Sequence, residues 1–347
     1  MTGGEIHDGG ADYLLDVRDL KVHFRLPRRN ILTPGGTVHA VDGISYRVRR
    51  GSTFGIVGES GSGKTTAALA AMRLVPVTGG SIRLDGVEMT TLGGDALREM
   101  RRKIQIVFQD PYSSLNPRMR AGAIVREPMD LMEVGDPAER DLRVAELFDR
   151  VGLRPEQAAL FPHQFSGGQR QRIGVARALA TQPELIVCDE PVSALDVAIQ
   201  AQILNLLREL QEGFGLTYLF ISHDLGVVQY ICDDIAVMYL GEIVEQSDRV
   251  SLFTLPLHPY TWALISAVPS ARRRTSGQDG RVRLEGDPPN PIDPPPGCRF
   301  APRCPFAVDR CHSEKPALRE VREGHLVSCH LVGDDCVPPH AAMAGAS

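Results

Sequence analysis

The chain has 347 residues and a formal net charge of −5, with 43% hydrophobic and 23% charged residues. These values fit a globular protein of about two domains and exclude wholesale disorder. The acidic balance argues against a nucleic-acid binder, and the seven cysteines are too few for a disulfide scaffold. No apolar run reaches the roughly 18 residues of a membrane span, and the first residues lack a secretory pattern, so we expect a soluble protein.

The first elements in chain order are strands. Apolar residues alternate with polar ones between positions 13 and 50, which predicts antiparallel strands. The apolar run 53–57 predicts a short buried strand, and 65–74 predicts a helix. A glycine-rich loop separates the two, and the order strand, glycine-rich loop and helix begins an α/β nucleotide-binding fold.

The middle of the chain alternates between helical and strand patterns. Residues 104–108 predict a strand, whereas 110–184 carry helical spacing without a strong strand and predict a helical subdomain. Buried strands are predicted at three apolar runs, with a helix at 199–210 between the first two: 185–188, 217–221 and 235–239. Continuous apolar strands alternating with helices predict a mostly parallel sheet covered by helices.

The composition changes after residue 268. Residues 269–297 are rich in proline and arginine and are expected to form an extended linker. We therefore expect one large α/β domain over 12–268, with its helical subdomain at about 110–184. A cysteine-rich extension over 298–333 and a tail over 334–347 follow the linker.

Residues 58–65, GESGSGKT, match the phosphate-binding P-loop pattern. Glycines let backbone N–H groups turn toward a phosphate, Lys64 supplies a positive charge and Thr65 a hydroxyl for Mg²⁺. The alternative is a chance glycine-rich turn between a strand and a helix. The predicted phosphate-binding residues are Gly58, Glu59, Ser60, Gly61, Ser62, Gly63, Lys64, Thr65 and Thr66.

Two further segments offer partners for a nucleotide. Asp189 and Glu190 follow the strand 185–188, at the end where ligands bind in open α/β sheets. Asp189 would hold Mg²⁺ and Glu190 could polarise the attacking water. Ser166, Gly167, Gly168 and Gln169 open a predicted helix, and they suggest that one subunit covers the nucleotide of another. The alternative is that Ser166 only caps a surface helix.

Together these segments resemble the ATP-binding subunit of ABC transporters. Gln109 in VFQDP resembles the Q-loop glutamine, residues 193–196 the D-loop, and His223 in ISHD the switch histidine. The resemblance implies a P-loop NTPase fold of the ABC type, with an antiparallel β subdomain and a helical subdomain. It implies ATP and Mg²⁺ as cofactors in a head-to-tail dimer, with Glu190 as catalytic base and His223 on the γ-phosphate.

The same resemblance places Gln109 with Thr65 and Asp189 at the Mg²⁺. The signature begins with Phe165, where leucine is more usual in the family. The aromatic residue that stacks on adenine is not obvious, and we take His39 as the candidate, with Phe24 as the alternative.

Residues 110–117, DPYSSLNP, and 257–261, LHPYT, resemble the oligopeptide/dipeptide branch of peptide and nickel importers. This implies a peripheral subunit at the cytoplasmic face of the cell membrane that energises peptide import through two permease subunits. The segment after Gln109 would receive a coupling helix from a permease. A solute-binding protein would take part indirectly, and a second related ATPase is preferred to a homodimer. No nucleic-acid partner is expected.

Other functions stay open at this point. The cargo could be nickel, glutathione or another small solute, or the chain could be a redox-sensing regulatory ATPase. An ABC ATPase acting on ribosomes or DNA usually has two fused cassettes, whereas this chain has one P-loop.

Four cysteines lie within residues 298–329, directly after the linker, whereas Cys336 belongs to the tail: Cys298, Cys304, Cys311 and Cys329. In a reducing compartment such a set favours a metal over disulfides. Its spacing fits neither a zinc ribbon nor the bacterial ferredoxin run, although four thiolates suit Zn²⁺ or a [4Fe–4S] cluster. The resemblance to peptide importers favours the iron–sulfur cluster, with zinc or free thiols as alternatives.

Overall fold

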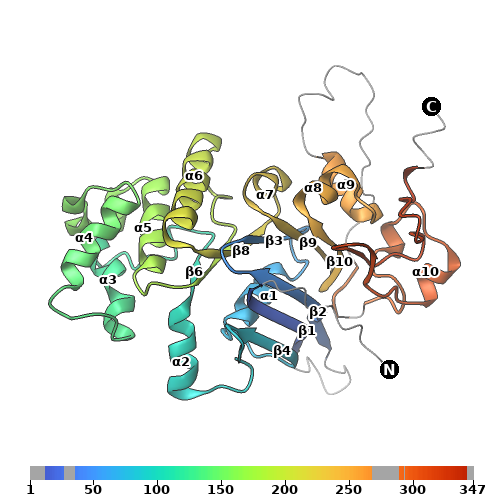
Figure 1. The fold of residues 1–347 in the computed structure, drawn as a ribbon, viewed down its shortest axis with the longest axis horizontal. Helices are drawn as coiled ribbons and strands as arrows, with labels where there is room; N and C mark the ends of the chain where they lie inside the picture. Colours follow the sequence, from blue (N-terminus) through green and yellow to red (C-terminus); the bar gives the residue numbers. More distant parts are fainter. Residues whose placement is uncertain (1–11, 27–35, 268–288, 293, 342–347) are drawn as a thin grey trace.

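The computed structural model describes residues 12–26, 36–267, 289–292 and 294–341 (Figure 1). Most of the predicted linker at 269–297 lies outside these residues. The described chain forms two sheets with helices around them. None of its helices combines the length and the apolar character needed to cross a membrane.

The smaller sheet is antiparallel, in the order β2-β1-β4-β5. Its strands are β1 (Tyr13–Arg25), β2 (Thr37–Arg49), β4 (Gly79–Leu84) and β5 (Val87–Glu88). The alternating pattern near the N-terminus therefore predicted β1 and β2 correctly. Alternate residues such as Leu15 and Val17 are buried against the rest of the protein.

The larger sheet has the order β11-β12-β10-β9-β3-β8-β7-β6. Five neighbouring strands are parallel: β3 (Thr53–Val57), β6 (Ile104–Val107), β7 (Leu185–Asp189), β8 (Thr217–Ser222) and β9 (Asp234–Tyr239). The apolar runs predicted all five. Three antiparallel strands that the sequence pattern did not predict extend one edge: β10 (Glu242–Asp248), β11 (Arg319–Arg322) and β12 (His325–Val327).

The helices fill the space between and around the sheets. They are α1 (Lys64–Ala71), α2 (Gly94–Lys103), α3 (Ala121–Leu131), α4 (Arg140–Arg150), α5 (Gly167–Leu179), α6 (Val197–Phe214), α7 (Leu225–Ile231), α8 (Arg249–Thr254), α9 (Pro259–Ala267) and α10 (Asp309–Ser313). Short 3₁₀ helices span Pro155–Ala159, Pro162–Gln164 and Ala301–Arg303. Helix α1 contacts both sheets, so the residues before it lie at the centre of the molecule.

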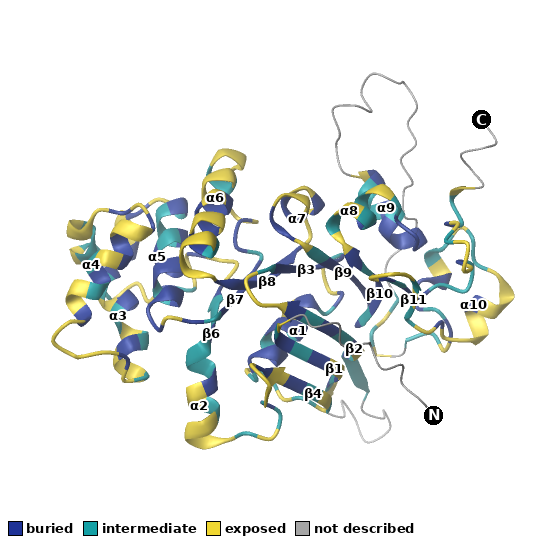
Figure 2. Cartoon of the chain, in the orientation of Figure 1, coloured by how far each residue is buried: buried dark blue, intermediate teal, exposed yellow. Residues whose placement is uncertain are grey.

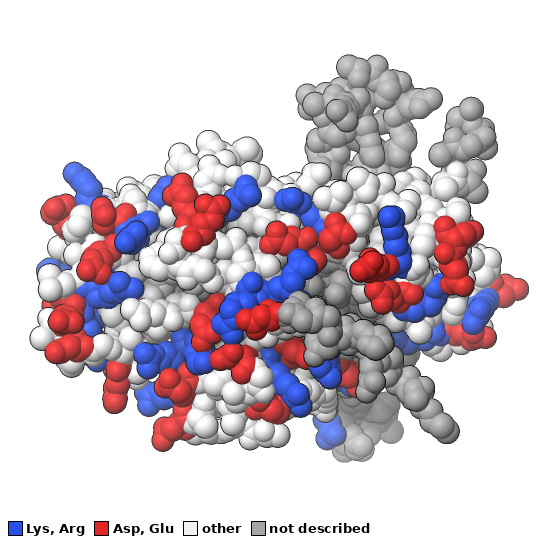
Figure 3. Space-filling model, viewed as in Figure 1, with Lys and Arg blue, Asp and Glu red and all other residues white. Residues whose placement is uncertain are grey.

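Helices α3, α4 and α5 form one end of the molecule, and the segment with α10 forms the other (Figure 1). Their inward faces are buried and their outer faces exposed (Figure 2). In α6, the residues predicted to share one face, Ile203, Leu206, Leu207 and Leu210, are buried. Basic and acidic side chains are interspersed on the face shown in Figure 3.

The C-terminal segment joins the larger sheet through β12, which pairs with β10. At this junction Glu245 of β10 is completely buried, and one of its carboxylate oxygens lies 2.7 Å from Nε2 of His325 in β12. The backbone N–H groups of Leu257 and His258 donate to the same carboxylate. The cysteine-containing segment is therefore continuous with the sheet that carries the P-loop pattern.

Candidate functional site

Four parallel strands of the larger sheet end side by side. β3 is followed by the loop 58–63, β6 by Gln109, β7 by Glu190 and β8 by His223. This edge is where ligands bind in open α/β sheets. The topology thus brings the predicted catalytic residues and the predicted phosphate-binding loop to one place.

The loop 58–63 has a backbone that only glycine can supply at two points. Gly63 has a φ of 102°, and a Cβ there would lie 2.1 Å from the carbonyl oxygen of Ala40. A Cβ at Gly58 would meet the carbonyl oxygen of Met238 at the same distance. Gly63 also provides no side-chain cap for α1, so the first N–H groups of this helix stay open toward the loop.

Lys64 is buried, and its ammonium group donates to the carbonyl oxygens of Gly58 and Glu59, each at 2.8 Å. Burial lowers the pKa of Lys64 from its usual value, while the nearby carboxylates of Glu190 and Asp189 act in the opposite direction. The side chain therefore places a positive charge inside the loop, held by neutral oxygens of the loop itself, the two carbonyls and the hydroxyl of Ser62, which an anion can replace.

Thr65, the neighbour of Lys64, and Asp189 bring two oxygen donors together. The hydroxyl of Thr65 donates to Oδ1 of Asp189 at 2.9 Å. Asp189 is 6% exposed, and burial raises the pKa of its carboxyl group from the usual value. A hydroxyl and a carboxylate are hard donors of the kind that Mg²⁺ prefers, so the donor set fits this ion.

Glu190 lies between the two other predicted catalytic residues. Nε2 of Gln109 donates to Oε2 of Glu190 at 2.8 Å, and Nδ1 of His223 lies 3.0 Å from Oε1. Glu190 also has a φ of 47°, a backbone conformation that is strained for a residue other than glycine. A carboxylate oriented by two neighbours at a strand end can accept a proton from a water molecule.

The predicted signature segment lies at the start of α5, and two of its residues hydrogen-bond to each other. Oγ of Ser166 accepts from the backbone N–H of Gln169 at 3.3 Å, and the Gln169 side chain accepts from the N–H of Ser166 at 3.0 Å. Gly168 packs closely against Ile199 of α6. Within the described chain no hydrogen bond joins this segment to residues 58–66, so one chain does not bring both together.

Known proteins share both the sequence and the fold of this chain. Residues 41–193 match the family described as ABC transporter, and residues 244–311 match the oligopeptide/dipeptide transporter C-terminal region. The oligopeptide transport ATP-binding protein AppF of Bacillus subtilis is 50% identical over 319 residues, which cover 92% of this chain and 97% of AppF. The chain belongs to the oligopeptide/dipeptide branch of the ABC transporter ATP-binding proteins.

Two solved structures resemble this ABC ATPase in fold. One is the dimeric ATP-binding cassette MJ0796 in a post-hydrolysis state with ADP and phosphate, with a TM-score of 0.60 and 29% identity over 68% of this chain and 98% of that one. The other is cbiO1 from Clostridium perfringens, with a TM-score of 0.60 and 28% identity over 70% of this chain and 91% of that one. Both likenesses fit the α/β fold described above.

The remaining P-loop residues of the ABC ATPase line the same turn. Ser60, Gly61 and Thr65 are exposed, Thr66 is half-buried, and Ser62 is buried. The carbonyl oxygen of Ser62 accepts from the N–H of Gly241, which anchors the loop to the turn after β9.

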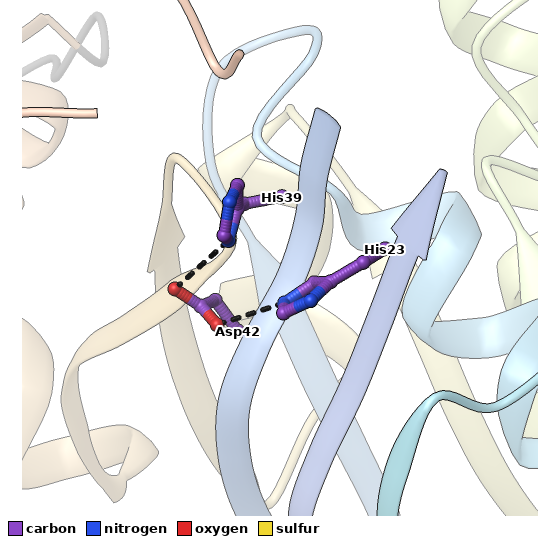
Figure 4. A group of neighbouring side chains, drawn as sticks. All are labelled: His23, His39 and Asp42. Carbon is purple, nitrogen blue, oxygen red and sulfur yellow. Dashed lines mark hydrogen bonds and ion pairs between the residues drawn. The ribbon is translucent and has the colours of Figure 1, made fainter. Parts of the chain in front are cut away.

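His39, the candidate for adenine stacking, lies in β2 next to Ala40, the residue that contacts Gly63. Its ring centroid is 4.3 Å from that of His23, and both rings approach Asp42 (Figure 4). Burial acts to raise the pKa of Asp42, but the hydrogen bond from His23 and the charge of Arg299 outweigh it and lower that pKa. Arg299 forms an ion pair with Asp42, so the carboxylate between the two histidines already has a positively charged partner. The alternative stacking residue, Phe24, is 38% exposed in β1.

The four C-terminal cysteines of the ABC ATPase are free thiols in a partly buried region. The backbone N–H of Cys298 donates to the carbonyl oxygen of Cys311 at 2.8 Å. Burial raises the pKa of the Cys298 thiol to about 11 and that of Cys304 to about 12, and the influence of Cys329 and Cys311 adds to both shifts. The fold therefore gathers these thiols although they span residues 298–329 of the sequence.

The partners of Glu59 were not predicted from the sequence. Its carboxylate accepts two hydrogen bonds from Arg303, at 2.6 and 3.1 Å, and its backbone N–H donates to the hydroxyl of Tyr260 at 2.9 Å. The only sequence signal was that Tyr260 lies in the HPYT motif and that Arg303 precedes Cys304. Neither position indicates by itself a contact with the P-loop.

Proposed function

We propose that this ABC ATPase hydrolyses ATP with Mg²⁺ to energise the import of oligopeptides or dipeptides through a membrane permease. The placement of Glu190 between Gln109 and His223, beside the Thr65–Asp189 pair, carries the ATPase part of the proposal. The identity to AppF and the match to the oligopeptide/dipeptide C-terminal region support the peptide cargo.

The roles of the site residues follow from their positions. Lys64 and the open N–H groups of α1 would bind the phosphates, and Thr65, Asp189 and Gln109 would hold Mg²⁺, which neutralises phosphate charge when it is bound. Glu190 would accept the proton of the attacking water. His223 is half exposed, so it can reach both Glu190 and a γ-phosphate.

The signature segment would complete the site of a neighbouring subunit. This segment lies at the start of α5, in the group of helices that forms one end of the molecule (Figure 1), and consists of Ser166, Gly167, Gly168 and Gln169. In a head-to-tail dimer this segment would cover the nucleotide of the other subunit, and the related cassette MJ0796 was solved as a dimer. We propose a second, related ATPase as the partner, with a homodimer as the alternative. His39 would stack on the adenine.

The segment after Gln109 would bind the permease. Tyr112 is 60% exposed, and the guanidinium of Arg170 in α5 lies 4.1 Å from the centre of its ring. A coupling helix seated on this tyrosine would therefore also push on the helix that carries the signature. We propose that the subunit lies at the cytoplasmic face of the membrane and binds a permease of two subunits there.

The four C-terminal cysteines would hold an iron–sulfur cluster. Four thiolates suit such a cluster. The fold supports the proposal by gathering the cysteines, since the thiols of Cys329 and Cys311 act on those of Cys298 and Cys304. Iron and sulfide assays after anaerobic purification test this, and a colourless protein with stoichiometric zinc would overturn it.

Uptake measurements test the cargo. Cells that carry Lys64→Ala in this chain alone should lose uptake of labelled dipeptides and oligopeptides. Normal peptide uptake together with lost uptake of nickel, glutathione or another solute would move the cargo to that solute. The exposed, unrelated Arg310→Gln change serves as the control and should leave uptake unchanged.

A further inference from the structure

The P-loop of this chain is tied to the cysteine-rich segment by a bidentate ion pair. Glu59, the second residue of the loop, accepts from both terminal nitrogens of Arg303. The Arg303 side chain is 6% exposed and that of Glu59 is 30% exposed. Paired planar contacts of this kind fix geometry as well as charge.

The surroundings of Arg303 make its position rigid. It ends the 3₁₀ helix Ala301–Arg303, its guanidinium carbon lies 5.8 Å from the centre of the Tyr239 ring, and one of its nitrogens lies 3.4 Å from the Tyr239 hydroxyl. Phe300, which is 1% exposed, packs against Tyr239 and Tyr260 with centroids 5.3 and 5.4 Å away. The same aromatic group thus supports Arg303 and the tyrosine hydroxyl that binds the N–H of Glu59.

Glu59 is in turn a direct neighbour of the phosphate-binding lysine. Its carbonyl oxygen accepts from Nζ of Lys64 at 2.8 Å, and its charge is among those that act on this lysine. A displaced Glu59 would move the carbonyl that orients Lys64. An unpaired Glu59 carboxylate would also place a negative charge beside the phosphates of a bound nucleotide.

We infer that Arg303 is a positioning residue for the P-loop, which holds Glu59 in place and neutralises its carboxylate so that the loop can bind the phosphates of ATP. The inference rests on the proposed binding of ATP at residues 58–65. It makes the affinity for nucleotide depend on a residue between two of the C-terminal cysteines, Cys298 and Cys304.

Equilibrium titration of the purified full-length chain with a fluorescent ATP analogue tests the inference. In Arg303→Gln the Kd of the chain should rise about tenfold, the effect of one unpaired charge at close range, while kcat of the assembled dimer at saturating ATP changes less than about twofold. Arg303→Lys keeps the charge but loses the bidentate contact, so its Kd should lie between that of the unmodified chain and that of Arg303→Gln. The double variant Glu59→Gln/Arg303→Gln removes both charges and should restore the Kd to within about threefold of the unmodified chain.

Arg310→Gln is the matched control, because Arg310 lies in the same segment but pairs with exposed Glu314. If Arg303→Gln binds as tightly as this control, or if the double variant is as weak as the single one, Arg303 has only a structural role and the inference is wrong. Thermal melting of each variant shows whether the chain has folded, and the comparison of the double variant with Arg303→Lys holds even where Arg303→Gln does not fold. Failure of the unmodified chain to bind the analogue, or unchanged binding by Lys64→Ala, would instead contradict the proposed ATP site.

Discussion

Helices α1 and α5 both begin at segments predicted to bind phosphate, yet their first turns differ in hydrogen bonding. At α1 the N-cap is Gly63, which offers no side chain to the first N–H groups. At α5 the N-cap is Ser166, whose hydroxyl and backbone N–H both pair with Gln169. The α1 terminus has no side-chain cap, whereas at α5 a side chain already accepts from one of the first N–H groups, that of Gln169.

This difference separates nucleotide binding by one chain from completion of the site by a second subunit. The sequence motifs do not distinguish these two requirements. We expect the α1 terminus to bind a nucleotide in a single chain, because glycine geometry leaves its first N–H groups uncapped and a buried lysine lies beside them. At the α5 terminus Ser166 and Gln169 bond to each other, and we expect it to bind a nucleotide when these bonds rearrange as a second subunit approaches. Binding and hydrolysis should therefore respond to different substitutions.

Glu190→Gln should give the largest effect. We expect kcat for ATP to fall at least about 100-fold, the usual contribution of a positioned general base, with little change in Kd. ATP should then trap the dimer, which size-exclusion chromatography would detect. The exposed Glu212→Gln is the control, and unchanged hydrolysis in Glu190→Gln would show that Glu190 is not the base.

Gly63→Ala should abolish nucleotide binding and lower the free energy of unfolding by about 3 kcal/mol, because a Cβ combines a strained φ with a backbone clash. Gly167→Ala at the start of α5 is the matched change. There a Cβ meets Leu195 at an ordinary 3.5 Å, so stability should stay the same or rise by up to about 1 kcal/mol. Urea denaturation measures both, and equal losses would contradict the contrast between the two termini.

Ser166→Ala should lower the free energy of unfolding by about 1 kcal/mol through loss of the cap. ATP affinity of the isolated chain should not change, while turnover of the assembled dimer should fall. Ser166→Asn keeps the capping oxygen and should preserve stability. A changed Kd in the isolated Ser166→Ala chain would show that the α5 terminus already contacts nucleotide without a partner.

Asp189→Asn should change the free energy of unfolding the least, and near neutral pH it should raise this free energy rather than lower it. Burial raises the folded pKa of Asp189, so its protonated form is favoured in the fold. The stability that this gives is present in acid, below the unfolded pKa, and is lost as the pH rises through the folded pKa. The asparagine variant should therefore be slightly more stable above that range and no different in acid, although its Mg²⁺-dependent hydrolysis is lost. Denaturant midpoints across pH 3 to 8 measure this, and a variant that is less stable at neutral pH would contradict it.

Local patterns predicted those parts of the fold that are set by local burial. The five parallel strands are short runs of apolar residues, because both of their faces are covered. Strand β10 was missed because it carries Glu245 and Gln246, and the burial of Glu245 depends on His325, far along the chain. Helix α2 was missed because it is mostly charged and buries only Met100.

The site shows the same division between local and distant information. The positions of Lys64, Glu190 and His223 follow from motifs at strand ends, so the sequence could place them at one edge. The contact between Arg303 and Glu59 joins residues 244 positions apart, and a single arginine before a cysteine carries no local pattern. Distant pairings of this kind need the folded chain.

The pairing of β12 with β10 makes the C-terminal segment a cover for the edge of the sheet. Besides the ladder between these strands, the N–H of Ser328 donates to the carbonyl oxygen of Val244. A chain cut within the proline-rich linker would leave β10 as an open edge strand with unpaired backbone groups and a buried glutamate without its histidine. Exposed edges of this kind promote aggregation. Removing the cysteines by truncation would therefore produce an insoluble protein, and their role is better studied by substitution of single cysteines in the intact chain.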